Sequence, residues 1–166
     1  MKTGFAILAV AALSAAGLTS AQAQTAQPAA GAQAASAPAP AREDWNAFSR
    51  SSSRVYLANV GSIAALGDVT SIQIALVPLR GAAGDLTHSR ENVEFKCAAK
   101  QSRTVATTEY GPDGVQTDNY DDSAAEWDAY SATSRDAYLS VLACDGQRSA
   151  PPTWQSVKAY VDAGRK

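Results

Sequence analysis

Residues 71–76 read SIQIAL and residues 92–97 read NVEFKC, and these two stretches decide the fold of the chain. Every second side chain is apolar in both: Ile72, Ile74 and Leu76 in the first, Val93, Phe95 and Cys97 in the second. Such an alternation is typical of a strand with one buried and one polar face. The sequence therefore predicts a β-sheet built around these two strands, with Val93 and Phe95 in its core.

Earlier and later segments extend the predicted sheet. Val55 and Leu57 indicate one earlier strand. We also expect an opening strand that contains Trp45, a predicted core residue, and Phe48.

Residues 101–110 are rich in Thr and Val and lead into YGPDG at residues 110–114. In that turn Pro presets the first position, Asp bonds back to the backbone and Gly takes a positive φ. Residues 115–120 then form a returning strand. Because these connections are short, we expect an antiparallel meander.

After residue 122 the apolar period changes to that of helices. Capping boxes at residues 123–126 and 133–136 predict two helix starts, and Thr153 after a proline pair predicts a third. The side chains expected on the helical faces are Trp127 and Tyr130; Ala137, Val141 and Cys144; and Trp154, Val157 and Val161. The predicted fold class is α+β: an antiparallel meander with C-terminal helices packed on one face, and one disulfide.

The N-terminal segments predict export. Residues 1–23 have one basic residue, an apolar run and a small-x-small ending, the pattern of a cleaved signal peptide. Residues 24–42 are rich in Ala, Pro and Gln and predict a disordered linker, so residues 43–166 are the expected single domain. We expect a periplasmic protein, with the cell surface or secretion as alternatives.

Composition excludes several classes of protein. The chain of 166 residues carries 14 basic and 16 acidic residues, a net charge of -2, with no basic cluster, which argues against a nucleic-acid partner. No other long apolar run follows the leader, so we expect no transmembrane segment after cleavage. No cysteine lies near the cleavage site, so we expect no lipid anchor.

The two cysteines predict one disulfide. An even cysteine count in an exported chain favours a bridge between Cys97 and Cys144. A redox-active pair is disfavoured because the C-x-x-C spacing is absent.

The sequence offers little catalytic chemistry. His88 is the only histidine and is expected in a solvated loop; a Ser-His-Asp arrangement lacks the G-x-S-x-G elbow. The chain has too few nitrogen and sulfur ligands for a zinc site, and we expect no cofactor. One acidic patch fits either adventitious calcium or a solvated turn and helix start: Asp113, Asp118, Asp121, Asp122 and Glu126. We expect no enzyme.

Aromatic residues gather between positions 110 and 138. The candidate interaction surface consists of Tyr110, Tyr120, Trp127 and Tyr130. Tyr and Trp combine a large contact area with a polar group, as in recognition surfaces, but the same residues also fit the core and rim of a sheet–helix interface.

The order of these features resembles the surface-adhesin protein E-like domain of small exported bacterial proteins. The resemblance covers about residues 45–145 and rests on Trp45, residues 54–57 (RVYL), 61–63 (GSI), 72–76, 89–90 and 93–97, Arg103, the hairpin at 110–114, Trp127 and Cys144. It implies a mainly antiparallel sheet with a helix, tied by the disulfide. The founding adhesin of the family binds host matrix proteins. Many members of the family are lipoproteins, whereas we expect no lipid anchor on this chain.

The preferred hypothesis is an exported, non-enzymatic interaction module that binds a protein or envelope component. The alternative is a periplasmic inhibitor or accessory subunit of an envelope enzyme, with the glycine-rich loop at residues 80–89 entering its target. A small hydrolase acting through His88 is the third hypothesis.

Overall fold

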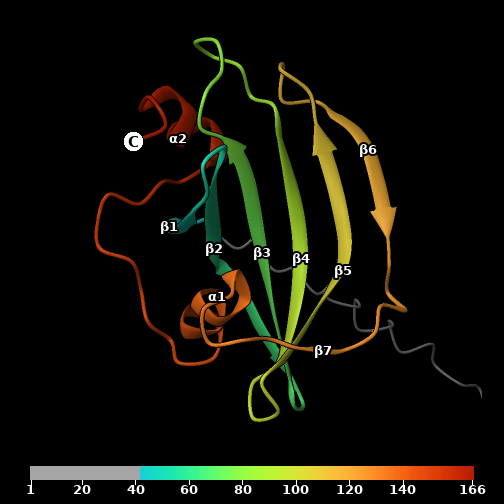
Figure 1. Cartoon of the computed structure of the whole chain (residues 1–166). Helices are drawn as coiled ribbons and strands as arrows, with labels where there is room; N and C mark the ends of the chain where they lie inside the picture. The colour runs from blue at the N-terminus through green and yellow to red at the C-terminus, as the bar shows by residue number, and fades with distance from the viewer. Residues whose placement is uncertain (1–41) are drawn as a thin grey trace, which may run out of the picture. The chain divides into compact units, whose positions relative to one another are not determined.

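Seven antiparallel strands form one sheet in the computed structural model, which describes residues 42–166 (Figure 1). The predicted signal peptide and nearly all of the predicted linker lie outside the described residues. The elements are β1 (Trp45–Arg50), β2 (Arg54–Leu66), β3 (Val69–Pro78), β4 (His88–Lys96), β5 (Gln101–Tyr110), β6 (Gln116–Asp121), β7 (Asp128–Ala129), α1 (Arg135–Ala143) and α2 (Val157–Asp162).

The strands follow one another across the sheet in the order β1-β2-β3-β4-β5-β6, so the predicted antiparallel meander is confirmed. β7 pairs with the start of β5, on the side where β6 pairs with its end. The expected core residues Trp45, Val93 and Phe95 are all fully buried. Within residues 42–166, no helix has the length and apolar character needed to cross a membrane.

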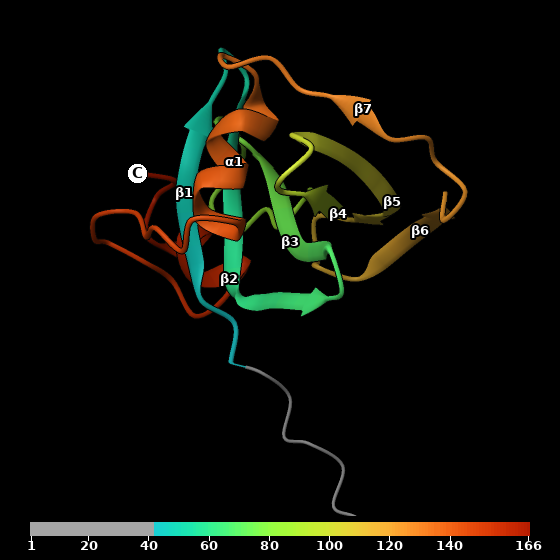
Figure 2. The ribbon, with the colours of Figure 1, turned by 90° about the horizontal axis from the view of Figure 1, so that it is seen from below.

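Both faces of the central strands are apolar. Tyr56 and Ala58 point to one face, with the alternate residues of β3, and Val55 and Leu57 point to the other. α1 packs on the first face through Leu139, Leu142 and Ala143; α2 packs on the second through Val157, Tyr160 and Val161. We call these the α1 face and the α2 face. The helices therefore cover opposite faces, not one face as predicted (Figures 1 and 2).

α1 begins one residue later than its capping box predicted. The hydroxyl of Ser134, not Thr133, caps it by accepting a hydrogen bond from the Ala137 amide at 3.2 Å. Its buried side differs from the expected one, because Val141 lines a groove instead of the core. Cys144, at the C-cap, is bonded to Cys97, which follows β4 directly, as predicted.

The helix predicted behind residues 123–126 is absent, and the chain there forms a turn followed by β7. Arg103 explains the difference, since its guanidinium donates to the carbonyl oxygens of Ser123 and Ala125 at 3.4 and 3.2 Å. Those oxygens are thereby held by the sheet. The Trp127 ring then lies against the Arg103 guanidinium and the Lys96 ammonium, each 4.5 Å from its centroid.

The segment before α2 closes one edge of the sheet. The predicted start at Thr153 is wrong, because Ser156 caps the helix and Trp154 precedes it in an extended conformation. Trp154 exchanges two backbone hydrogen bonds with Trp45, at 2.7 and 3.0 Å. Ser149 donates its hydroxyl to the Ala47 carbonyl oxygen at 2.8 Å. The outer edge of β1 is therefore occupied by this segment.

We expect the disulfide to hold α1 on its face of the sheet. Cys97 and Cys144 are 47 residues apart, and constraining a loop of that length in the unfolded chain is worth about 4 kcal/mol in the chain-entropy model. The double substitution of Cys97→Ala and Cys144→Ala should lower the free energy of unfolding in urea by about that amount. A loss below about 1 kcal/mol would contradict this role of the bridge.

Candidate functional site

The four aromatic residues of the predicted interaction surface lie on two different faces. Residues directly opposite each other in a ladder share a face, which places Tyr110 on the α2 face and Tyr120 on the α1 face. Tyr130 packs against the core of the α1 face. Trp127 lies beside Lys96 and Arg103, whose side chains are on the α2 face. The structure does not bring the four into one patch.

Three of these four side chains are already engaged within the fold. Trp127 is one of them, through its contacts with Lys96 and Arg103. Tyr110 stacks on the His88 ring with centroids 4.4 Å apart and planes 3° from parallel. Tyr130 meets Phe95 edge-on at 5.9 Å. Of the four residues, only Tyr120 is more than half exposed, at 57%. Of the predicted surface, Tyr120 is therefore the residue free to contact a partner.

His88 is buried at the start of β4, so the expectation of a solvated loop histidine is wrong. Its Nδ1 lies 2.6 Å from the Leu86 carbonyl oxygen, which assigns the proton to Nδ1. Nε2 then accepts a hydrogen bond from Arg90 Nε at 3.3 Å. Both ring nitrogens are occupied, so His88 has no free lone pair with which to act as a general base.

Arg90 connects several parts of the α2 face. Its guanidinium carbon lies 5.1 Å from the Trp45 ring centroid and 5.2 Å from that of Tyr110. Its Nη1 donates to Glu43 at 2.9 Å and to Gln73 at 3.4 Å. The second Glu43 oxygen accepts from the Trp45 indole N–H at 2.8 Å. We call Glu43, Trp45, His88, Arg90 and Tyr110 the Arg90 cluster. The hydrogen bonds of Glu43 to Arg90 and Trp45 hold the segment before β1 on the sheet.

Burial of the imidazole lowers the pKa of His88 from its usual value, and the nearby Arg90 charge lowers it further, while the Leu86 carbonyl partly opposes the shift. A proton on Nε2 would also remove the acceptor for Arg90. The folded protein therefore favours neutral His88.

The free energy of unfolding should fall as the pH drops below about 6.5, because the unfolded chain then takes up a proton that folded His88 resists. Urea denaturation at about pH 7.5 and about pH 5.5 measures this loss. His88→Gln should flatten the pH dependence in this window. An unchanged slope in that variant would assign the dependence to other groups.

Arg90→Lys should lower the free energy of unfolding by about 1–2 kcal/mol, because an ammonium cannot stack between two rings and bond both Glu43 and His88. Arg54→Lys is the matched control, since Arg54 is exposed. Equal effects of the two substitutions in urea denaturation would contradict a special role for the Arg90 guanidinium.

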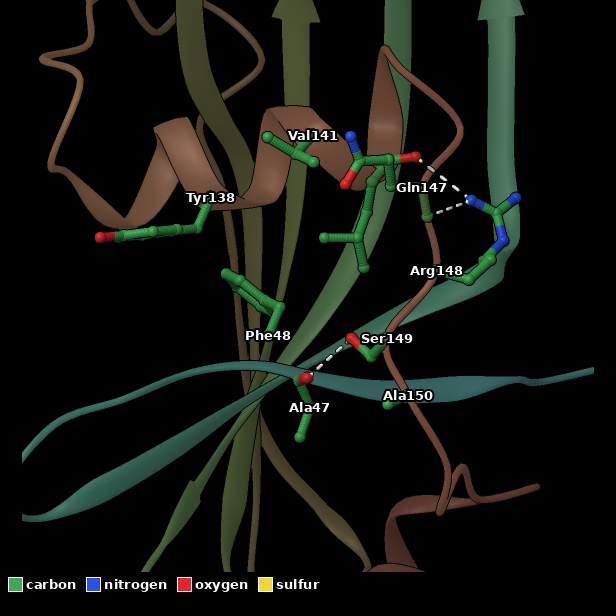
Figure 3. A pocket seen from close by; sticks show the side chains of 9 residues that line it. Ala47, Phe48, Tyr138, Val141, Gln147, Arg148, Ser149 and Ala150 are labelled. Carbon is green, nitrogen blue, oxygen red and sulfur yellow. Dashed lines mark hydrogen bonds between the residues drawn. The ribbon is translucent and has the colours of Figure 1, made fainter.

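A groove of about 470 Å³ lies between α1, β1 and the chain that follows α1 (Figure 3). Phe48 from β1 and Tyr138, Val141 and Leu142 from α1 supply its apolar wall. Arg148 stands at its rim and donates to the carbonyl oxygens of Leu142, in α1, and of Gln147, in the chain that follows, at 3.4 and 2.7 Å. Sequence reasoning missed this groove, because it forms where two distant segments meet.

A second hollow, polar and about 380 Å³ in volume, opens on the α1 face beside β6. Tyr120 and Asp122 line it together with Glu91 and Arg135. Arg135 donates to Glu91 at 2.8 Å and to Asp136 at 2.9 Å. Desolvation acts against its charge, but these two carboxylates outweigh it and raise the pKa of Arg135. The guanidinium is thus fixed as a cation within its ion pairs.

The edge strand β6 beside this hollow is exposed along its whole length. It pairs with β5 on one side, and its other side has no strand partner within residues 42–166. Glu109, Asp113, Asp118, Asp121, Asp122, Glu126 and Asp128 are the seven acidic residues of segment 104–134, which contains no basic residue. In residues 42–166, groups of three or more His, Cys, Asp or Glu positioned to hold a metal ion are not found.

No protein-family model, curated protein or solved structure matches this chain.

Proposed function

We propose that this chain is an exported, non-enzymatic interaction module that binds a protein or another component of the cell envelope. The observation that supports it is the contrast between the two edges of the sheet. The β1 edge is occupied by the chain's own Ser149 and Trp154, whereas β6 is fully exposed and carries Tyr120. An exposed strand with an accessible aromatic side chain is suited to contact with another macromolecule.

The state of the only histidine also favours binding over catalysis. A hydrolase acting through His88 needs a free imidazole nitrogen near a nucleophile, and both His88 nitrogens are engaged with Leu86 and Arg90. The resemblance to the surface-adhesin protein E-like domain agrees with an interaction role and is part of the same proposal.

Tyr120→Ala should weaken partner binding about tenfold, the effect of losing about 1.4 kcal/mol of contact free energy. Tyr138→Ala is the matched control, because Tyr138 is similarly exposed, at 52% against 57%, but lies on α1. In-cell cross-linking followed by co-purification from cells measures capture. Equal capture by both variants would contradict a contact at Tyr120, and a wild-type chain that captures nothing would contradict the interaction module itself.

Location can be tested separately by adding protease to intact cells. We propose a periplasmic location, so the domain should be protected until the outer membrane is opened. Cleavage in intact cells would instead place it at the surface, where host matrix proteins become the ligands to screen.

An inhibitor or accessory subunit of an envelope enzyme is the second candidate, supported by the loop at residues 80–87; His88 and Ser89, the last two residues of the predicted segment 80–89, are instead buried in β4. Arg165 donates to the Asp85 and Ala82 carbonyl oxygens at 2.5 and 3.5 Å, and the Leu86 amide donates to Pro112 at 2.9 Å. A loop held at this end of the sheet is suited to insertion into a cleft. Deleting residues 82–84 should abolish inhibition of any enzyme that co-purifies; unchanged enzyme activity would exclude this role.

A further inference from the structure

We propose that the outer edge of β6 accepts an extended, Lys- or Arg-rich segment of a partner protein as an additional strand. This inference rests on the proposed interaction function and names the site and the chemistry of the partner. Three features of the described residues support it: the open edge, the charge around it and the apolar side chains beside it.

The open edge supplies the main-chain bonds. Every second residue of an edge strand directs its N–H and C=O outward, where another extended chain can pair with them. At the opposite edge these groups are occupied, because Trp154 bonds to the backbone of Trp45 and Ser149 to that of Ala47. β6 spans six residues, so it offers a template of roughly 20 Å.

Charge decides which chain can pair there. All of the acidic residues of segment 104–134 except Glu109 are exposed, and the ion pairs of the described residues involve other carboxylates. Asp118 lies on the α1 face and Asp121 on the α2 face, so pairing of β6 with β6 of a second copy would add a second set of carboxylates along both faces of the strand, and like charges across a ladder repel. A basic segment would meet attraction at the same positions.

Apolar contact adds selectivity for an extended partner. Val115 precedes β6 and Tyr120 lies within it, and they are 61% and 57% exposed. Side chains alternate along an added strand, so a partner that alternates Lys with Val or Thr can direct its Lys row to the α2 face, beside Asp121, and its apolar row to the α1 face, beside Tyr120. Tyr120 and the hollow beside it lie on the α1 face, where one of these rows would pack.

Three labelled, end-capped peptides of eight residues test the inference against the whole oxidised chain by fluorescence anisotropy. The first alternates Lys with Val and Thr; the second keeps the Lys residues but has Pro at the alternate positions; the third has Glu in place of Lys. We expect the first to bind, the second to bind at least about tenfold more weakly, because Pro removes main-chain donors, and the third not to bind. Affinity should fall as salt rises from about 0.02 M to about 0.3 M.

The double substitution Asp118→Lys with Asp121→Lys should weaken binding of the first peptide by at least about tenfold. Asp68→Lys with Asp145→Lys is the matched control, because both residues are exposed and the net charge changes equally. The control should retain binding within about threefold. Asp118→Asn with Asp121→Asn repeats the test with a smaller change, and urea denaturation checks that each variant is folded.

Equal loss in the control pair, or equal binding of the Pro-containing peptide, would overturn the inference, since the first would show diffuse charge attraction and the second binding without strand pairing. Absence of binding by the first peptide would overturn it as well. If the Asp118 and Asp121 variants still capture the cellular partner while losing the peptide, the inference fails but the interaction module stands. If the wild-type chain captures no partner, the proposed function fails first.

Discussion

Apolar residues on both faces of β2 and β3 are the constraint on which the rest of the structure depends. A sheet whose central strands are apolar on both sides must be covered twice. One C-terminal segment supplies both covers, α1 on one face and Trp154 with α2 on the other, so the chain between them has to pass around an edge of the sheet. It passes β1, where Ser149 and Trp154 bond to the strand (Figure 1). Closure of the β1 edge is thus a consequence of covering both faces.

Two consecutive charges in β4 fix the register of this arrangement. Arg90 points to the α2 face and pairs with Glu43, while Glu91 points to the α1 face and pairs with Arg135. A slip of one residue exchanges the two faces. A slip in one direction would place Arg90 beside Arg135, and a slip in the other direction would place Glu91 beside Glu43, so either slip replaces an attraction by a repulsion. Partly exposed ion pairs contribute little net stability, and their larger effect here is to disfavour the shifted register.

The strands could be predicted from sequence because their signal is local, whereas the helices and the site depended on distant contacts. Alternation in SIQIAL gave a correct strand but suggested one buried face; the continuous apolar run of residues 74–77, IALV, was the sign of burial on both faces. The segment at 123–126 has a capping box, yet Arg103 holds its carbonyl oxygens and β5 pairs with the residues that follow. Similarly, nothing near His88 in sequence indicates that Tyr110 stacks on it or that Arg90 bonds to it.

The acidic segment shows how a sequence feature acquires meaning from its position. Seven carboxylates without a basic residue between positions 104 and 134 are visible in the sequence, where they fit a solvated turn. The sheet order places them around β6, an outer strand that the chain itself leaves uncovered within the described residues. At a covered edge such charge would face the protein's own backbone; at an open edge it repels identical edges and attracts cationic chains. The same side chains can therefore keep copies apart and select a partner, because both effects follow from the sign of the charge.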